Sequence, residues 1–75
     1  MKQKIIEILN EIRPEFDFTE SVNFIEEGML DSFDVVRLVV ELDNEFSTSI
    51  DGEDILPNNF SSIENIITLL HKNGV

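Results

Sequence analysis

Apolar residues recur at the spacing of an α-helix over two long segments in the first two thirds of this chain. Residues 2–13 form the first segment, and Pro14 should end its helix because a residue that precedes proline is driven out of helical backbone conformation. Residues 32–47 form the second and clearest segment, where Asp31 stands in the position of an N-terminal capping side chain. The pattern therefore predicts two amphipathic helices joined by a long connection.

A third helix is predicted over about residues 62–72, near the end of the chain. Its start matches the capping-box pattern, with Ser61 as the cap and Glu64 reaching back to it, and Gly74 is a plausible C-terminal stop. Residues 53–56 could add one short helical turn. We therefore expect an all-α fold, a small four-helix bundle of three main helices and one short helix.

The connection over residues 14–30 shows no sustained period, so we expect a long loop there. It contains too many large apolar groups for a solvated linker, and we expect some of them to pin the loop to the core. Its apolar side chains are Phe16, Phe18, Val22, Phe24, Ile25, Met29 and Leu30.

The helix over residues 32–47 carries two apolar stripes where a simple surface helix needs one. The first stripe is a conventional core face, and the second, on nearly the opposite side, consists of Phe33, Val36 and Val40, with Arg37 beside it. The second stripe is either a docking surface for a partner or is covered internally by phenylalanines of the loop. The core stripe contains Val35, Leu38, Val39, Leu42 and Phe46.

Length, cysteine content and net charge limit what kind of protein this can be. Seventy-five residues without cysteine make one domain, residues 1–75, held only by its apolar core. The net charge is −11, and residues 14–64 carry fourteen acidic residues against Arg37 alone. Such a surface repels nucleic acid and attracts basic protein patches, although acidity can also serve solubility alone.

No apolar run is long enough to span a membrane, and Glu7 follows the first residues too early for a secretion signal. We therefore expect a cytoplasmic protein. We also expect it to be a monomer. The acidic residues lack the ligand spacing of an EF-hand, and no metal site is predicted.

Ser32 is the candidate reactive residue because it directly follows the helix-capping Asp31, where its hydroxyl should face solvent. A hydrolase would need a base near this serine, but the only histidine, His71, fits a surface position at a helix end. No G-x-S-x-G elbow is present. We therefore interpret Ser32 as a place where another enzyme attaches a group, and the chain as a protein without catalytic residues.

These residues resemble the acyl carrier protein family, in which a D-S-L motif opens the second helix of a four-helix bundle. The motif stands here as Asp31-Ser32-Phe33. The resemblance extends over residues 24–28 before the motif, residues 38–46 after it, Ile50 and the apolar last helix, and so covers nearly the whole chain.

The resemblance implies that Ser32 carries 4′-phosphopantetheine, transferred from coenzyme A by a phosphopantetheinyl transferase, with cargo held as a thioester on the distal thiol. It also implies partners with basic docking patches: a ligase that loads the cargo, and downstream acyltransferases or synthases. By matching position, the second helix would supply apolar contacts from Phe33, Val36 and Val40. Its acidic contacts would come from Asp34, Glu41, Asp43 and Glu45.

The sequence leaves two classes of cargo as alternatives. Acyl intermediates of fatty acid, polyketide or related biosynthesis are the first expectation. However, Arg37 stands where carriers of fatty acid synthesis typically have an acid, and Gly28-Met29-Leu30-Asp31-Ser32-Phe33 resembles the G-x-L-D-S-F of D-alanyl and peptidyl carriers. An aminoacyl carrier is therefore an alternative. An unmodified acidic adaptor protein would explain the negative net charge and the second apolar stripe equally well. It would not explain why Ser32 stands between Asp31 and Phe33.

Overall fold

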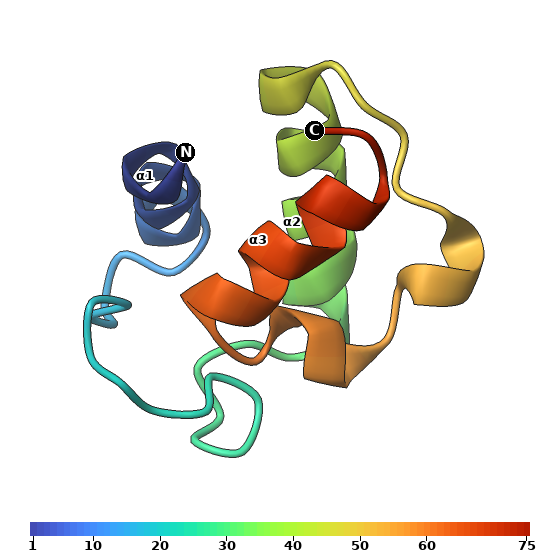
Figure 1. Ribbon diagram of the computed structural model, residues 1–75. Helices are drawn as coiled ribbons and strands as arrows, with labels where there is room; N and C mark the ends of the chain where they lie inside the picture. Colours follow the sequence, from blue (N-terminus) through green and yellow to red (C-terminus); the bar gives the residue numbers. More distant parts are fainter.

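The computed structural model describes all residues, 1–75, and contains helices but no strands (Figure 1). Both 3₁₀ helices lie between the second and third α-helices. The elements are α1 (Lys2–Ile12), α2 (Ser32–Phe46), η1 (Gly52–Asp54), η2 (Pro57–Phe60) and α3 (Ile63–Lys72). None of these helices combines the length with the apolar character that a membrane span requires. The predicted small all-helical bundle is confirmed.

The segment between α2 and α3 departs from the prediction of one short helical turn at residues 53–56. Two 3₁₀ helices stand there, and neither exceeds four residues. The Asp51 side chain caps the first by accepting from the N–H of Glu53 at 2.9 Å. Pro57 then opens the second, since a proline is tolerated at a first helical position but prevents one helix from running through. The predicted short turn is therefore present as η1, shifted toward the N-terminus, and the second 3₁₀ helix η2 was not predicted.

The start of α3 also differs from the predicted capping box. The cap is Ser62, whose Oγ accepts from the N–H of Asn65 at 3.0 Å. Ser61, the predicted cap, is buried, and its hydroxyl donates to the carbonyl of Asn58 at 2.8 Å. The chain thus enters the helix one residue later than expected, which places Glu64 where it cannot reach back to the cap. At the other end, Gly74 adopts a positive φ of 91°, as its predicted role as a stop requires.

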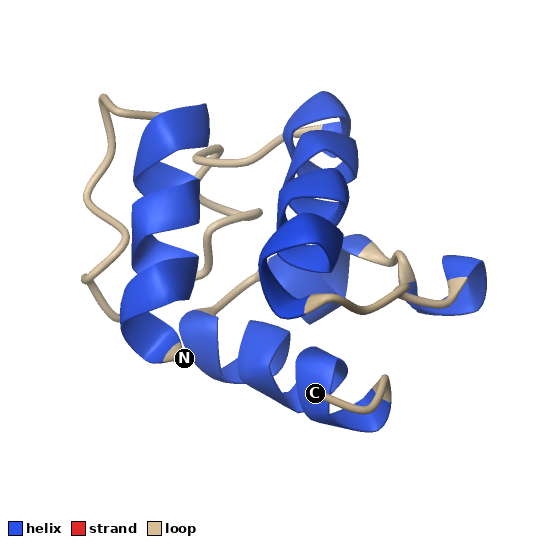
Figure 2. Ribbon diagram, turned by 90° about the horizontal axis from the view of Figure 1, so that it is seen from above, coloured by secondary structure: helices blue, strands red, loops and turns tan.

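The helices enclose one apolar core, with α1 beside both α2 and α3 (Figure 2). The core face predicted for α2 is buried at four of its five positions, and Phe46 at the end of the helix is half-buried. The other two α-helices each bury one stripe. The buried residues of α1 and α3 are Ile5, Ile8, Leu9, Ile12, Ile63, Ile66, Leu69 and Leu70.

The long loop between α1 and α2 crosses one end of the bundle and delivers the chain to the start of α2 (Figure 1). Phe18 and Phe24 are fully buried and pack edge to face, with ring centroids 5.0 Å apart. The carbonyl of Phe24 accepts from the N–H groups of Met29 and Leu30 at 2.9 and 3.2 Å. The prediction of an ordered loop pinned to the core is confirmed.

Candidate functional site

Ser32 is the first residue of α2 and is exposed, and its hydroxyl makes no hydrogen bond within the protein. The preceding residue, Asp31, has extended backbone, and its Oδ1 accepts from the N–H of Asp34 at 2.9 Å. Oδ2 of Asp34 accepts in return from the N–H of Asp31 at 3.1 Å. Asp31 is thus the cap that the sequence predicted, and Asp34 completes a reciprocal capping box.

Arg13, just after α1, reaches across to this capping box, and nothing in the local sequence pattern indicated it. Its Nε donates to Oδ2 of Asp34 at 2.8 Å, and one terminal nitrogen lies 3.8 Å from Oδ2 of Asp31. The other terminal nitrogen pairs with Glu15 at 3.0 Å. The start of α2 is therefore fixed to the end of α1 by a forked ionic contact.

This contact shifts the pKa of both partners. Partial burial of Asp34 alone would raise the pKa of its carboxyl, but the N–H of Asp31 and the Arg13 guanidinium outweigh burial and hold that pKa below its usual value. The hydrogen bond that Arg13 donates to the Asp34 carboxylate in turn raises the pKa of Arg13 above its usual value. Asp34 is therefore a carboxylate at neutral pH and cannot act as a general acid there.

No side chain of this protein is placed to activate the Ser32 hydroxyl. Neither a histidine nor a carboxylate accepts a hydrogen bond from it, and His71 lies exposed in the last turn of α3. A serine without a base is a weak nucleophile, so the arrangement can receive a group from another enzyme but cannot begin catalysis itself.

A shallow apolar groove of about 270 Å³ adjoins Ser32. The side chains that line it come from the long loop, the first turns of α2, the residue after η1 and the first residue of η2. Together with the free backbone N–H groups of the first turn of α2, which favour an anion, the groove suits a phosphodiester followed by an uncharged chain. The residues around the groove besides Ser32 and Asp31 are Ile25, Leu30, Val35, Val36, Ile55 and Pro57.

The second apolar stripe of α2 is open to solvent. Phe33 is 85% exposed, Val36 60% and Val40 52%, so the alternative in which loop phenylalanines cover this stripe is wrong. Arg37 beside them is exposed and makes no ion pair. Leu56, in the segment between η1 and η2, is also exposed, at 55%, which the sequence interpretation did not anticipate. We call Phe33, Val36, Arg37 and Val40 the α2 face.

The four acidic residues predicted to join this face are not equivalent. Glu45 is exposed and Glu41 half-exposed, whereas the Asp34 side chain is only 15% exposed and is bound to Arg13. Asp43 is half-buried, and its Oδ1 accepts from the N–H of Ile50 at 3.0 Å. Two of the four carboxylates thus stabilise the domain through contacts of their own.

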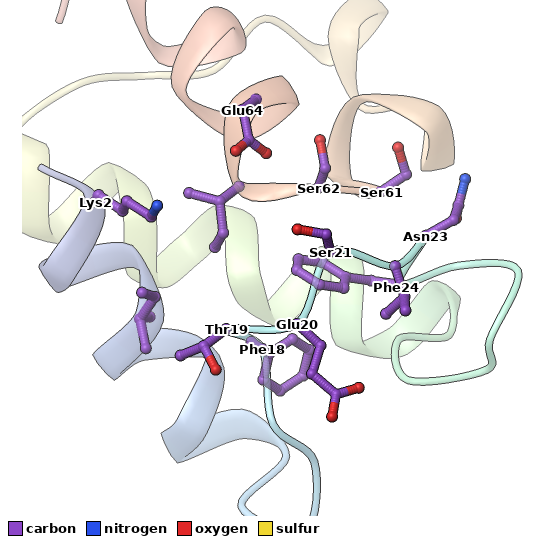
Figure 3. Close-up of a pocket in the computed structure, with 13 residues that line it drawn as sticks. Lys2, Phe18, Thr19, Glu20, Ser21, Asn23, Phe24, Ser61, Ser62 and Glu64 are labelled. Carbon is purple, nitrogen blue, oxygen red and sulfur yellow. The ribbon is translucent and has the colours of Figure 1, made fainter.

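A larger hollow of about 500 Å³ lies away from Ser32, between the long loop and the first turns of α1 and α3. Figure 3 shows Lys2 of α1 and Glu64 of α3 among the residues that line it, with Ser21, Ser61 and Ser62 on the side toward Asn23. Its lining is mixed, with charged, hydroxyl and apolar side chains, and no buried polar side chain is left without a partner. The hollow gives no chemical indication of a ligand.

Comparison with known proteins agrees with this geometry. Residues 1–70 match the family model described as the phosphopantetheine attachment site. The D-alanyl carrier protein of Bacillus velezensis is 30% identical over 71 residues, which cover 92% of this chain and 91% of that protein. No solved structure matches the chain significantly. The chain therefore belongs to the phosphopantetheine attachment-site family of carrier proteins, which are not enzymes and bear 4′-phosphopantetheine as a covalent cofactor.

Proposed function

We propose that Ser32 carries the 4′-phosphopantetheine arm and that this carrier transports an aminoacyl group, D-alanine, as a thioester. The observation that carries the proposal is the exposed, unbonded hydroxyl of Ser32 at the start of α2, within a chain that matches the attachment-site family over residues 1–70. When bound, the arm supplies a terminal thiol to which the cargo is joined.

In the attachment step, Ser32 provides the oxygen. A bond forms between its Oγ and a phosphorus of the coenzyme A pyrophosphate, and the pyrophosphate bond breaks to release the nucleotide. The proton of the hydroxyl passes to a base of the transferase, since this chain holds no base at Ser32. The first-turn N–H groups of α2 would favour the negative charge of the phosphodiester, and Asp31 keeps that turn formed.

The α2 face is the proposed docking surface for the transferase, the loading ligase and the downstream acyltransferase. Phe33, Val36 and Val40 would enter an apolar recess, because burying such exposed side chains is favourable. Glu45 and Glu41 would meet basic groups at its rim. Arg37, which has no partner in this chain, would meet an acidic group, so the fitting surface is basic with one carboxylate within it.

The aminoacyl cargo is supported by two features. The D-alanyl carrier protein of Bacillus velezensis aligns over nearly the whole chain, and the segment from Gly28 to Phe33 resembles the G-x-L-D-S-F of aminoacyl carriers. The first expectation from the sequence, an acyl intermediate of fatty acid or polyketide synthesis, is the second candidate. It is favoured by the apolar groove beside Ser32, whose 270 Å³ suits a short acyl chain.

Loading assays separate the two cargoes. The chain carrying the arm is incubated with ATP and either a D-alanine-activating ligase with D-alanine or an acyl-activating ligase with short fatty acids, and its intact mass is measured. We expect the mass of one alanyl group, removable by hydroxylamine as a thioester requires, and no gain with L-alanine. A fatty acyl gain without an alanyl gain would overturn the aminoacyl proposal and support the acyl carrier.

The unmodified acidic adaptor makes a different prediction, since it would bind its partners through the α2 face without any arm. An adaptor would gain no mass from coenzyme A with any of several transferases, and Ser32→Ala would bind partners as the natural chain does. Either a mass gain or loss of function in Ser32→Ala contradicts the adaptor.

A further inference from the structure

We propose that Arg13 is a positioning residue of the attachment site, which holds the Asp31–Asp34 capping box and offsets the negative charge that the arm's phosphodiester adds at Ser32. This inference rests on the proposed function, because it assumes that Ser32 bears the arm.

The local sequence directs Arg13 away from helical conformation. Its N–H still donates to the carbonyl of Leu9 at 2.9 Å, but its φ and ψ of −135° and 79° leave the helix, as the following Pro14 requires. α1 therefore ends at Ile12, and the arginine side chain is presented to the first turn of α2. A planar guanidinium can contact several carboxylates at once from this position, which a lysine amine does less well.

A series of aromatic contacts supports the Arg13 guanidinium. The Cζ atom of Arg13 lies 5.7 Å from the ring centroid of Phe16, within the range of a cation–π contact. Phe16 packs edge to face on Phe18 at 6.4 Å, and Phe18 does so on Phe24 at 5.0 Å. The side chain of Arg13 is 30% exposed, so most of its surface is covered by neighbouring residues. The Arg13 guanidinium is thus linked through Phe16 to the buried phenylalanines of the core.

The charge balance at Ser32 explains why such a residue is needed. Ser32 stands between two carboxylates that form the capping box, in a chain of net charge −11, and the phosphodiester adds one more negative charge. The first-turn N–H groups of α2 supply only about half a positive charge. Arg13 is the only cation that pairs with either carboxylate. Without it, arm and carboxylates would repel one another.

The test compares the chain without and with the arm, in the natural sequence and in Arg13→Gln, by urea unfolding at low salt. Arg13→Gln lowers the stability of both forms, and we expect a further roughly two- to fivefold increase in the unfolding constant of the arm-bearing form, the size expected of one exposed charge pair. Arg13→Lys should restore much of this difference. Lys4→Gln is the matched control, since Lys4 is an exposed cation of α1 without an ion pair, and its two forms should respond equally.

High salt provides an independent readout. At about 1 M salt, where charges are screened beyond roughly 3 Å, the additional loss in the arm-bearing form of Arg13→Gln should disappear. An equal loss in both forms at low salt would overturn the proposal and leave Arg13 as a fold-stabilising residue only. Failure of the natural chain to gain an arm at Ser32 is a separate result, which would instead overturn the proposed function.

Discussion

The backbone N–H of Phe24 donates a hydrogen bond of 2.8 Å to the carbonyl of Ser61, joining the long loop to the residue before the cap of α3. The carbonyl of Phe24 meanwhile accepts from Met29 and Leu30, the two residues before Asp31. One buried residue therefore connects the loop, the entry to α3 and the approach to Ser32. The loop is thus part of the framework of the site.

Phe24 and Phe33 form a matched pair of phenylalanines with opposite burial, 1% and 85% exposed. Phe24→Ala should cost about 3–5 kcal/mol, because it leaves a cavity in a small core, and should largely unfold a domain of this size. Phe33→Ala should change stability by less than about 0.5 kcal/mol but slow arm transfer, since it removes proposed contact area. Urea unfolding followed by circular dichroism, with transferase kinetics, measures both effects. Near-native stability of Phe24→Ala would contradict the assigned core.

Asp31 should matter mainly as a cap. Asp31→Ala removes the acceptor for the N–H of Asp34 and should cost about 0.5–2 kcal/mol, whereas Asp31→Asn keeps an acceptor oxygen and should lose less. Urea unfolding gives the free energies, and transferase kinetics of the folded variants give a second readout. Slower arm transfer to Asp31→Asn at near-native stability would show that the transferase also recognises the charge. Equal rates would restrict Asp31 to the capping role.

The features that could be predicted from the sequence are those that depend on residues close together in the chain. The three α-helices, the core stripe of α2, the cap at Asp31 and the ordered loop all follow from periodicity, capping chemistry and proline. Periodicity also separated the two stripes of α2, and so placed Phe33 on the side of the helix opposite the core, where it is exposed.

The errors came where distant contacts choose between local options. Ser61 and Ser62 are equally good caps by type, and the choice of Ser62 follows from Ser61 being buried with its carbonyl accepting from Phe24. Likewise, nothing near Arg13 indicates that it contacts Asp34, because that contact depends on how α1 lies beside α2. Asp43 has the sequence pattern of a surface acid, but the turn after α2 brings the N–H of Ile50 to it.

Asp34 should make stability depend on pH. Its pKa is lowered in the folded protein, so its contribution is fully present above the ordinary aspartate pKa of about 4 and is lost as pH falls through the lower folded value. Asp34→Asn should therefore cost roughly 1 kcal/mol at neutral pH and progressively less in acid. Urea unfolding at several pH values between about 7 and 3 measures this convergence, with Glu26→Gln as the control for loss of one exposed carboxylate. A pH-independent difference would contradict the role of the ion pair.

Ser47 at the end of α2 is the only non-glycine residue with positive φ, at 50°. Left-handed backbone is unfavourable for a residue with a Cβ, so Ser47→Gly should stabilise the protein by up to about 1 kcal/mol. Ser49→Gly, a nearby exposed position without positive φ, should give no gain because glycine there only adds freedom to the unfolded chain. Thermal melts of the two variants provide the comparison, and equal changes would rule out relief of backbone strain.

Intact-mass measurement followed by peptide mapping, after incubation with coenzyme A and a phosphopantetheinyl transferase, tests the central claim that Ser32 is the attachment residue. The natural chain should gain one phosphopantetheine located on the peptide containing Ser32. Ser32→Ala should gain none, whereas Ser21→Ala, which removes an exposed serine of the long loop, should gain as much as the natural chain. An arm mapped to any other residue, or full modification of Ser32→Ala, would contradict the account.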